Sequence, residues 1–217
     1  MDDAITGVGL AKRFGRTDAL RGVSLSIPKN SVYCIAGENG SGKTTLLNIL
    51  SGAIVQDGGS VQAHGSIGYC RQTPLLYSDL SIRQNLSLFA EMLSSEPTAL
   101  SNAASMLNLF ESLEKKALEA SAGTRKKAEL AVSLLNNPEI LLMDEPTTGL
   151  DSFSSGELLT YIKSQKGKKT VVIATHQLCD LEGIATHLLV LEKGKKIFEG
   201  KVQGQLARLY EKITKKK

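Results

Sequence analysis

Gly37-Glu38-Asn39-Gly40-Ser41-Gly42-Lys43-Thr44 is the most informative stretch of this 217-residue chain. Its glycines let the backbone turn tightly, so that several N–H groups point into one concavity suited to a phosphate. Lys43 has the length to reach the β- and γ-phosphates, and the Thr44 hydroxyl can ligate Mg²⁺. The pattern G-x-x-x-x-G-K-[ST] predicts a loop that binds a nucleoside triphosphate, with an ordinary glycine-rich turn as the alternative.

The flanks of this loop supply the setting that it needs. Residues 31–36 form a short apolar run that predicts a buried strand, and residues 45–50 continue with helical spacing. A helix starting near Ser41 would aim its positive end at the bound anion, and Gly52 lies where such a helix would stop. Strand, loop and helix in this order indicate an α/β fold.

Composition limits the broad class of the protein. The chain is 41% hydrophobic, which opposes global disorder, and no apolar run approaches the length of a transmembrane helix. The acidic start Met1-Asp2-Asp3 does not resemble a signal peptide. Three scattered cysteines and three histidines show no metal-ligand spacing, and a reducing cytosol fits them best.

The net charge of +4 is modest and does not call for a nucleic-acid partner. Part of it lies in Lys215-Lys216-Lys217. Such a run is either a solvated end or a weak attachment to an anionic membrane face.

The segments before and after the loop differ in character. Residues 5–30 predict a small antiparallel sheet, 57–60 a turn, and 61–70 two further strands. Residues 73–136 are poor in glycine and predict a mostly helical insert. Within it Leu100, Ala103, Leu107 and Phe110 share one helical face, as do Leu130, Leu134 and Leu135.

The last third of the chain returns to alternating strands and helices. Residues 139–143 and 170–174 are apolar runs typical of central parallel strands. Residues 157–164 predict a helix, 188–198 a hairpin with a glycine turn, and 202–217 a terminal amphipathic helix.

Two adjacent acids, Asp144 and Glu145, end the first of these strands. Asp144 is placed to lie beside the Mg²⁺ of a bound triphosphate, and Glu145 projects differently and could deprotonate an attacking water. A helix N-cap is the alternative role for such a pair.

The segment Asp144-Glu145-Pro146-Thr147-Thr148-Gly149-Leu150-Asp151 resembles the Walker B motif and D-loop of ATP-binding cassette (ABC) ATPases. The resemblance covers about residues 5–200. It implies one domain, 1–217, with a mixed central sheet. A RecA-like core and an antiparallel β subdomain would occupy about 1–72 and 137–217, and a helical subdomain about 73–136.

The resemblance also implies roles for individual residues. Phe14 would stack on adenine, although an ordinary core or surface phenylalanine is the alternative. Gln72 matches the Q-loop glutamine, His176 the switch histidine and Asp151 the D-loop aspartate. Glu145, His176 and Lys43 would be the catalytic residues. Thr44, Gln72 and Asp144 would bind Mg²⁺. The residues implied to hold ATP are Phe14, Gly37, Asn39, Gly40, Ser41, Gly42, Lys43, Thr44, Thr45 and Gln72.

One motif departs from the family pattern. Where the family has Leu-Ser-Gly-Gly-Gln, this chain has Ala120-Ser121-Ala122-Gly123-Thr124. In the family this segment contacts the γ-phosphate held by the opposite subunit. Ser121 and the Gly123 N–H could still donate there, whereas the Ala122 methyl would weaken a close fit by about 1 kcal/mol. A plain helix start is the alternative reading of the segment.

As a member of this family the chain would form a dimer around two ATP molecules, with itself or with a second cassette. It would power transport through a separate transmembrane permease, on the cytoplasmic face of the cell membrane. The surface that would receive that permease includes residues 74–81, and their Leu-Leu-Tyr cluster at 75–77 fits either a docking patch or core packing. Residues 77–86 and 147–151 look most like cassettes of drug, lipid or polysaccharide exporters. Alternatives are an ABC ATPase acting on nucleic acid or ribosomes, or a P-loop kinase or GTPase.

Overall fold

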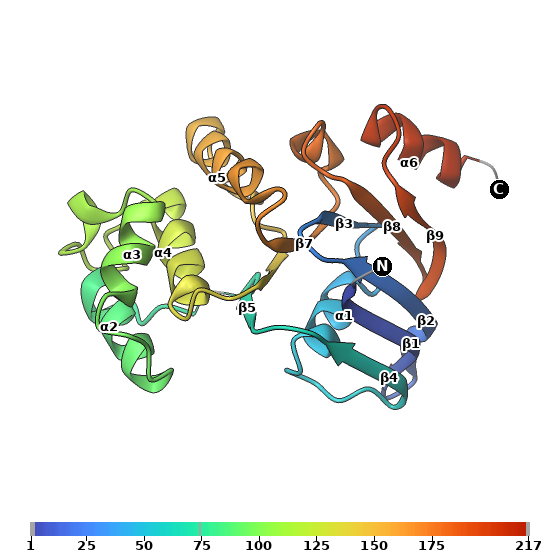
Figure 1. Cartoon of the computed structure of the whole chain (residues 1–217), viewed down its shortest axis with the longest axis horizontal. Helices are drawn as coiled ribbons and strands as arrows, with labels where there is room; N and C mark the ends of the chain where they lie inside the picture. The colour runs from blue at the N-terminus through green and yellow to red at the C-terminus, as the bar shows by residue number, and fades with distance from the viewer. Residues whose placement is uncertain (1–2, 74, 216–217) are drawn as a thin grey trace.

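The computed structural model describes residues 3–73 and 75–215, so Pro74 in the expected docking segment lies outside it. Two sheets organise the described chain (Figure 1). The strands are β1 Asp3–Phe14, β2 Thr17–Pro28, β3 Val32–Ala36, β4 Gly58–Ala63, β5 Ile67–Cys70, β6 Ile140–Asp144, β7 Thr170–Thr175, β8 His187–Glu192 and β9 Lys195–Lys201. The helices are α1 Lys43–Leu50, α2 Ile82–Met92, α3 Ala99–Met106, α4 Ala122–Leu134, α5 Ser152–Gln165 and α6 Leu206–Thr214, with short 3₁₀ turns η1 Phe110–Ser112 and η2 Leu178–Leu181.

The larger sheet has the order β5-β6-β7-β3-β8-β9. Its strands run parallel except β9, which pairs antiparallel with β8 and makes the sheet mixed. Every residue of β3, β6 and β7 is buried, as expected of strands covered on both faces. The α/β fold predicted from the sequence is confirmed.

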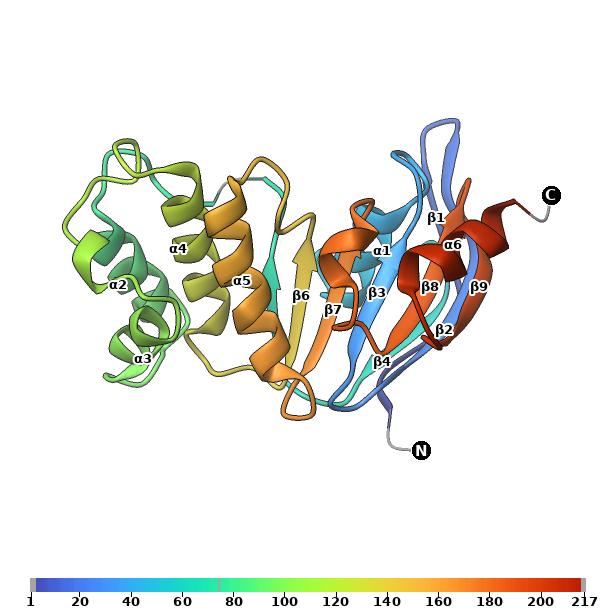
Figure 2. The same ribbon diagram turned by 90° about the horizontal axis from the view of Figure 1, so that it is seen from above.

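Successive residues of these strands point to opposite faces of the sheet and so build two cores. One core joins the sheet to α1 and to the small sheet β2-β1-β4. The other joins it to α5, α6 and the helices α2 to α4. Figure 2 shows α5 and α6 on one side of the large sheet and α1 on the other.

The turn predicted over residues 57–60 was wrong. The strand β4 begins at Gly58, and Ser60 lies opposite Val8 of β1. Gly59 adopts a φ of 82°, and a Cβ there would overlap the backbone of Val8 and Gly9. The segment joins the sheet because β1 offers it an open edge, which local turn propensity cannot reveal.

The helical part contains α2, α3, η1 and α4. A capping box at Ser81 starts α2: the Ser81 side chain accepts from the Gln84 N–H, and the Gln84 side chain accepts from the Ser81 N–H. The common face predicted for Leu100 to Phe110 was wrong at its end, because α3 stops at Met106 and Phe110 lies in η1, 56% exposed.

The predicted hairpin is confirmed, whereas the helix predicted over residues 202–217 extends only over Leu206–Thr214, and Lys216 and Lys217 lie outside the described residues. Lys193 and Gly194, both at positive φ, form the turn between β8 and β9. The helix α5 starts earlier than predicted, at Ser152, because Asp151 caps it.

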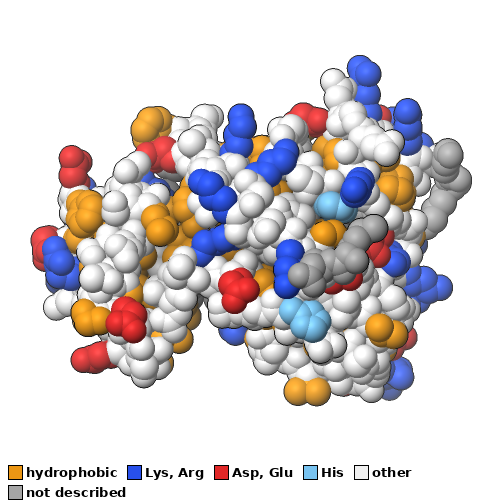
Figure 3. All heavy atoms as spheres, in the orientation of Figure 1, with side chains coloured by type: hydrophobic (Ala, Val, Ile, Leu, Met, Phe, Trp, Pro, Cys, Tyr) orange, Lys and Arg blue, Asp and Glu red, His pale blue; other side chains and the backbone are white. Residues whose placement is uncertain are grey.

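Exposed large apolar side chains are concentrated in the helical part, which carries several of the orange patches at the left of Figure 3. They include Met92, Leu93, Met106, Phe110 and Leu118. Among the described residues, no helix combines the length and the apolar character that crossing a bilayer requires.

Candidate nucleotide site

The glycine loop connects the end of β3 to the start of α1 as predicted. Gly42 is the N-cap of α1 with a φ of 107°, and a Cβ there would lie 2.6 Å from the Ala19 carbonyl oxygen. No side chain of the described residues caps this helix, so the N–H groups of its first turn are available to an anion. Position 42 therefore requires glycine on two counts, space and backbone angle.

Lys43 is buried against its own loop. Its ammonium donates to the carbonyl oxygens of Gly37 at 2.8 Å and Glu38 at 3.2 Å. It also lies 3.7 Å from a carboxylate oxygen of Glu145. Lys43 thus lies between the loop and the end of β6. A phosphate bound between these two elements would interact with the positive charge of Lys43.

Asp144 ends β6 with its side chain in the interior, only 1% exposed. Neither carboxylate oxygen has a hydrogen-bond partner among the described residues. Burial raises the pKa of Asp144, and the nearby Thr44 hydroxyl and Lys43 charge offset this only in part. A buried carboxylate without a partner, beside a threonine hydroxyl, is the hard oxygen environment that Mg²⁺ takes.

Glu145 leaves the strand in another direction because its φ is 47°. Its N–H donates to Ala174 O at 2.8 Å, and its carboxylate lies 2.9 Å from Nδ1 of His176. The Thr148 hydroxyl donates to the same carboxylate at 3.4 Å. Glu145 therefore lies against the end of β7 and close to Lys43, and its carboxylate is separate from that of Asp144. As a result, the N-cap alternative for the pair is wrong: Asp144 belongs to the strand, and α5 is capped by Asp151.

A cavity of about 540 Å³ lies between these elements. Nine predicted residues line it: Asn39, Gly40, Gly42, Lys43, Thr44, Thr45, Gln72, Glu145 and His176. Thr17, Asp18, Ala19 and Thr148 also line it and were missed. The first three lie in β2, just after the β1–β2 turn. Only their closeness to Phe14 in the sequence could have indicated that they belong to the site.

Phe14 itself does not line this cavity. It lies at the end of β1, 52% exposed, with the Lys12 ammonium 5.7 Å from its ring centroid. An exposed aromatic face beside the cavity wall of Thr17–Ala19 is compatible with adenine stacking; the exposure excludes core packing but not the surface alternative.

The signature-like segment lies at the start of α4. Ser121 is the N-cap: its hydroxyl accepts from the Thr124 N–H at 3.1 Å and shares a hydrogen bond with the Thr124 hydroxyl at 2.9 Å. A Cβ at Gly123 would overlap the Ser154 side chain of α5. None of residues 120–124 lines the cavity.

Two further contacts lie near this region: one caps α5, and the other links α4 to the residue before Gln72. Asp151 caps α5 by accepting from the N–H groups of Phe153 and Ser154, each at 3.0 Å, and the bonds from Ser154 lower the pKa of Asp151. Lys126 of α4 donates to the carbonyl of Arg71 at 2.9 Å, directly before Gln72. No local pattern pointed to Lys126, because its partner is 55 residues away in the chain.

The Leu-Leu-Tyr segment is buried only in part. Leu76 packs against the core, whereas Leu75 is 42% and Tyr77 55% exposed.

Comparisons with known proteins agree with this geometry. The ABC transporter family matches residues 20–148. Lantibiotic transport ATP-binding protein SrtF of Streptococcus pyogenes is 31% identical over 205 residues, 90% of each chain. Nod factor export ATP-binding protein I of Ralstonia nicotianae is 31% identical over 210 residues, 89% of this chain and 65% of the relative. The ADP conformation of MJ1267, an ATP-binding cassette of an ABC transporter, superposes with a TM-score of 0.87 at 26% identity, covering 99% of this chain and 98% of that one.

The match extends over most of the chain and includes both halves of the site, the glycine loop and the acid pair at the end of β6. This chain therefore belongs to the ABC transporter family, as an ATP-binding and ATP-hydrolysing cassette.

Proposed function

We propose that this cassette powers export of a substrate through a separate transmembrane permease, by closing and opening a dimer around ATP. The observation that carries the proposal is the single cavity shared by the glycine loop, Gln72, Glu145 and His176, with Asp144 buried beneath it. The export direction is supported by the resemblance to a Nod factor export protein.

The proposed chemistry is attack of water on the γ-phosphorus, with Glu145 as the base that takes its proton. The His176 ring at 2.9 Å orients the Glu145 carboxylate and stabilises charge beside it. Lys43 and the free N–H groups of α1 hold the phosphates, and Phe14 stacks on the adenine. Thr44, Gln72 and Asp144 would hold Mg²⁺, which supplies charge neutralisation of the phosphates when bound.

The dimer is proposed because the signature-like residues Ser121 to Thr124 lie outside the cavity of their own chain. They can reach a γ-phosphate only on another cassette, which is either a second copy or a different chain. The Ser121 hydroxyl is held by Thr124 at 2.9 Å, so the variant segment is ordered as a helix cap. Its Ala122 methyl is expected to make the closed dimer weaker than one built on Gly-Gly.

The membrane partner is proposed to dock near Leu75 and Tyr77, the exposed members of their segment. Docking there would hold the cassette peripherally on the inner face of the membrane. We also propose the division into a core of about 1–72 and 137–217 and a helical subdomain of about 73–136. The concentration of α2, α3 and α4 in the second range supports it.

The test compares the chain with Glu145→Gln. The variant should bind ATP normally, because its amide keeps the shape of the carboxylate, but it should hydrolyse ATP about 10²–10⁴-fold more slowly. Nucleotide binding by titration and phosphate release are the two readouts. Hydrolysis at the parent rate would contradict the role of Glu145.

Transport is tested separately by co-purification from the native membrane. A tagged chain with Leu75→Asp and Tyr77→Asp should lose its permease while retaining nucleotide binding. Met106→Asp, which changes an exposed apolar residue on α3, is the matched control. Isolation of nucleic acid or ribosomes in place of a membrane protein would contradict the transport proposal.

A further inference from the structure

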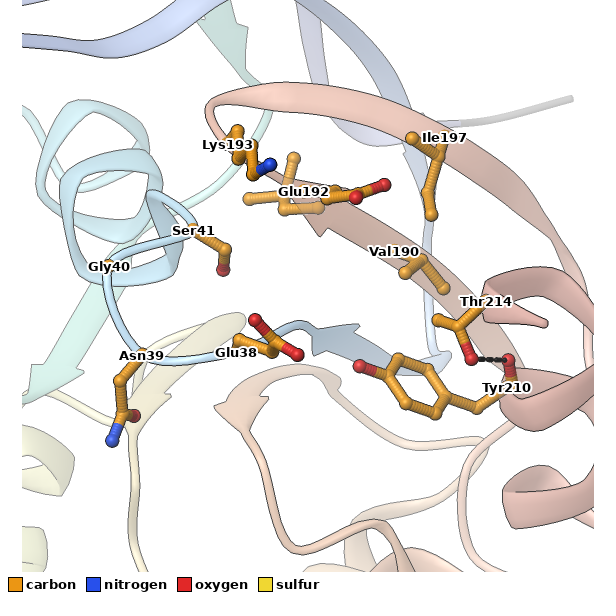
Figure 4. A pocket seen from close by; sticks show the side chains of 11 residues that line it. Glu38, Asn39, Gly40, Ser41, Val190, Glu192, Lys193, Ile197, Tyr210 and Thr214 are labelled. Atoms are coloured by element: carbon orange, nitrogen blue, oxygen red, sulfur yellow. Dashed lines mark hydrogen bonds between the residues drawn. The ribbon is translucent and has the colours of Figure 1, made fainter. Parts of the chain in front are cut away.

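A second cavity lies behind the glycine loop, on the side of α6 and the β8–β9 hairpin. Its volume is about 300 Å³, at the lower end of the range for small-molecule sites. Glu38 and Ser41 form one wall, Val190 and Ile197 another, and Tyr210 of α6 a third. Figure 4 shows these side chains converging on one space.

Ser41 provides the sign that this space is built for a ligand. Its residue is 4% exposed, and its hydroxyl oxygen has no hydrogen-bond partner among the described residues. In Figure 4 this hydroxyl points into the cavity. Leaving a buried hydroxyl unpaired costs stability, so such groups usually have a partner.

The electrostatics of the cavity favour a positive charge. The Glu38 carboxylate is exposed and forms no ion pair with any described residue, and the Tyr210 hydroxyl points toward it in Figure 4. Burial raises the pKa of Tyr210, and the carboxylates of Glu38 and Glu192 raise it further. Lys193 also lines the cavity, and its side chain at the hairpin turn is exposed like that of Glu38, so water screens both charges.

The opposite wall is apolar. The side chains of Val190 and Ile197 project from β8 and β9 beside the Tyr210 ring (Figure 4). The Thr214 hydroxyl donates to the Tyr210 carbonyl at 3.1 Å, so it is already satisfied within α6. A ligand here would thus need one charged end and one hydrocarbon end.

We propose that this cavity binds a small organic cation, an ammonium group with an apolar body. The ammonium would donate to the Glu38 carboxylate and to the Ser41 and Tyr210 hydroxyls, and the body would pack on Val190 and Ile197. An ammonium has three donors and no acceptor, which matches a wall of acceptors. A bare metal ion fits less well, because no group of three or more metal-ligating side chains exists among the described residues.

Such a ligand would touch the outer wall of the loop whose inner wall holds the phosphates. The Ser41 N–H donates to Glu38 O at 3.1 Å, and the Ser41 carbonyl accepts from Gly194 N at 3.0 Å. Glu38 O in turn accepts from Lys43 at 3.2 Å. A ligand that holds Ser41 and Glu38 therefore changes nucleotide affinity, and nucleotide changes ligand affinity by the same factor.

The experiment titrates the nucleotide-free chain with three probes of one length: hexylammonium, hexanol and hexanoate, at constant ionic strength. Calorimetry should detect saturable binding of hexylammonium alone. Glu38→Gln should weaken it about tenfold, the change expected from losing one charge-assisted hydrogen bond. Ile197→Trp should abolish it by filling the cavity. Glu211→Gln, the same change on an outward position of α6 paired with Lys215, should leave it unaltered.

A second measurement compares ATP affinity with and without saturating hexylammonium, and a shift that Ile197→Trp removes supports the coupling. The proposal is overturned if no probe binds, if hexanol or hexanoate binds as tightly as hexylammonium, or if Glu38→Gln is indistinguishable from Glu211→Gln. Because probe binding is measured without nucleotide, these outcomes are independent of whether the cassette exports anything.

Discussion

Replacing Asp144 with asparagine should stabilise the nucleotide-free protein. Both carboxylate oxygens are buried and have no hydrogen-bond partner among the described residues. An unsatisfied buried group costs about 1–3 kcal/mol, and more when it is charged. Asparagine keeps the shape but not the charge, so the variant should regain about 1 kcal/mol. For a chain of this size that is roughly 2–4 °C in melting temperature.

The dependence on pH follows from the raised pKa of Asp144. The folded state binds this proton more tightly than the unfolded state, in which the pKa is about 3.9. Stability is therefore lost as pH rises from that value through the folded pKa, and the loss persists at neutral pH. The Asp144→Asn variant does not lose stability in this way. Its higher melting temperature relative to the parent chain should therefore disappear in acid.

The assay is thermal denaturation in a chelator and then in excess Mg²⁺ and ATP. The parent chain should gain more from Mg²⁺ and ATP than the variant does, because only a carboxylate attracts the cation strongly. Asp180→Asn is the matched control: its carboxylate accepts from the Thr147 hydroxyl at 2.6 Å, so the change should lower the melting temperature. A lower melting temperature for Asp144→Asn in chelator would refute the reasoning.

Three further predictions use other parts of the site. Gly42→Ala should abolish ATP binding in a titration, because its Cβ would lie 2.6 Å from Ala19 O and its φ is 107°; unchanged affinity would contradict the packing. Ala122→Gly, which restores the family residue, should raise ATP-dependent dimerisation in gel filtration, and no change would remove Ala122 as the cause of weakness. Lys126→Met should destabilise the fold by about 1–3 kcal/mol in urea, since it leaves Glu129 buried without its cation 3.5 Å away. Burial raises the pKa of Glu129, so the loss of stability in Lys126→Met should shrink as pH falls toward about 4 and Glu129 becomes protonated. A loss of stability that does not depend on pH would argue against this role of Lys126.

Local patterns predicted the phosphate loop and the central strands well, because their physics is local. Glycines at 40 and 42 adopt positive φ, and the apolar runs of β6 and β7 are buried on both faces. The predictions failed where a distant partner decides. The strand β4 forms at Gly58 only because β1 lies beside it, and Phe110 leaves its predicted helical face because α3 stops at Met106.

The amino-acid sequence alone established that a triphosphate loop and an acid pair occur on an α/β chain, because spacing and residue chemistry carry that information. Only the tertiary structure brought Lys43 within 3.7 Å of Glu145 and Glu145 within 2.9 Å of His176, since parallel strands distant in sequence end at one edge of the sheet. It also excluded residues 120–124 from the cavity of their own chain and left the Ser41 hydroxyl without a partner behind the loop. Both facts depend on how elements pack, which no local pattern encodes.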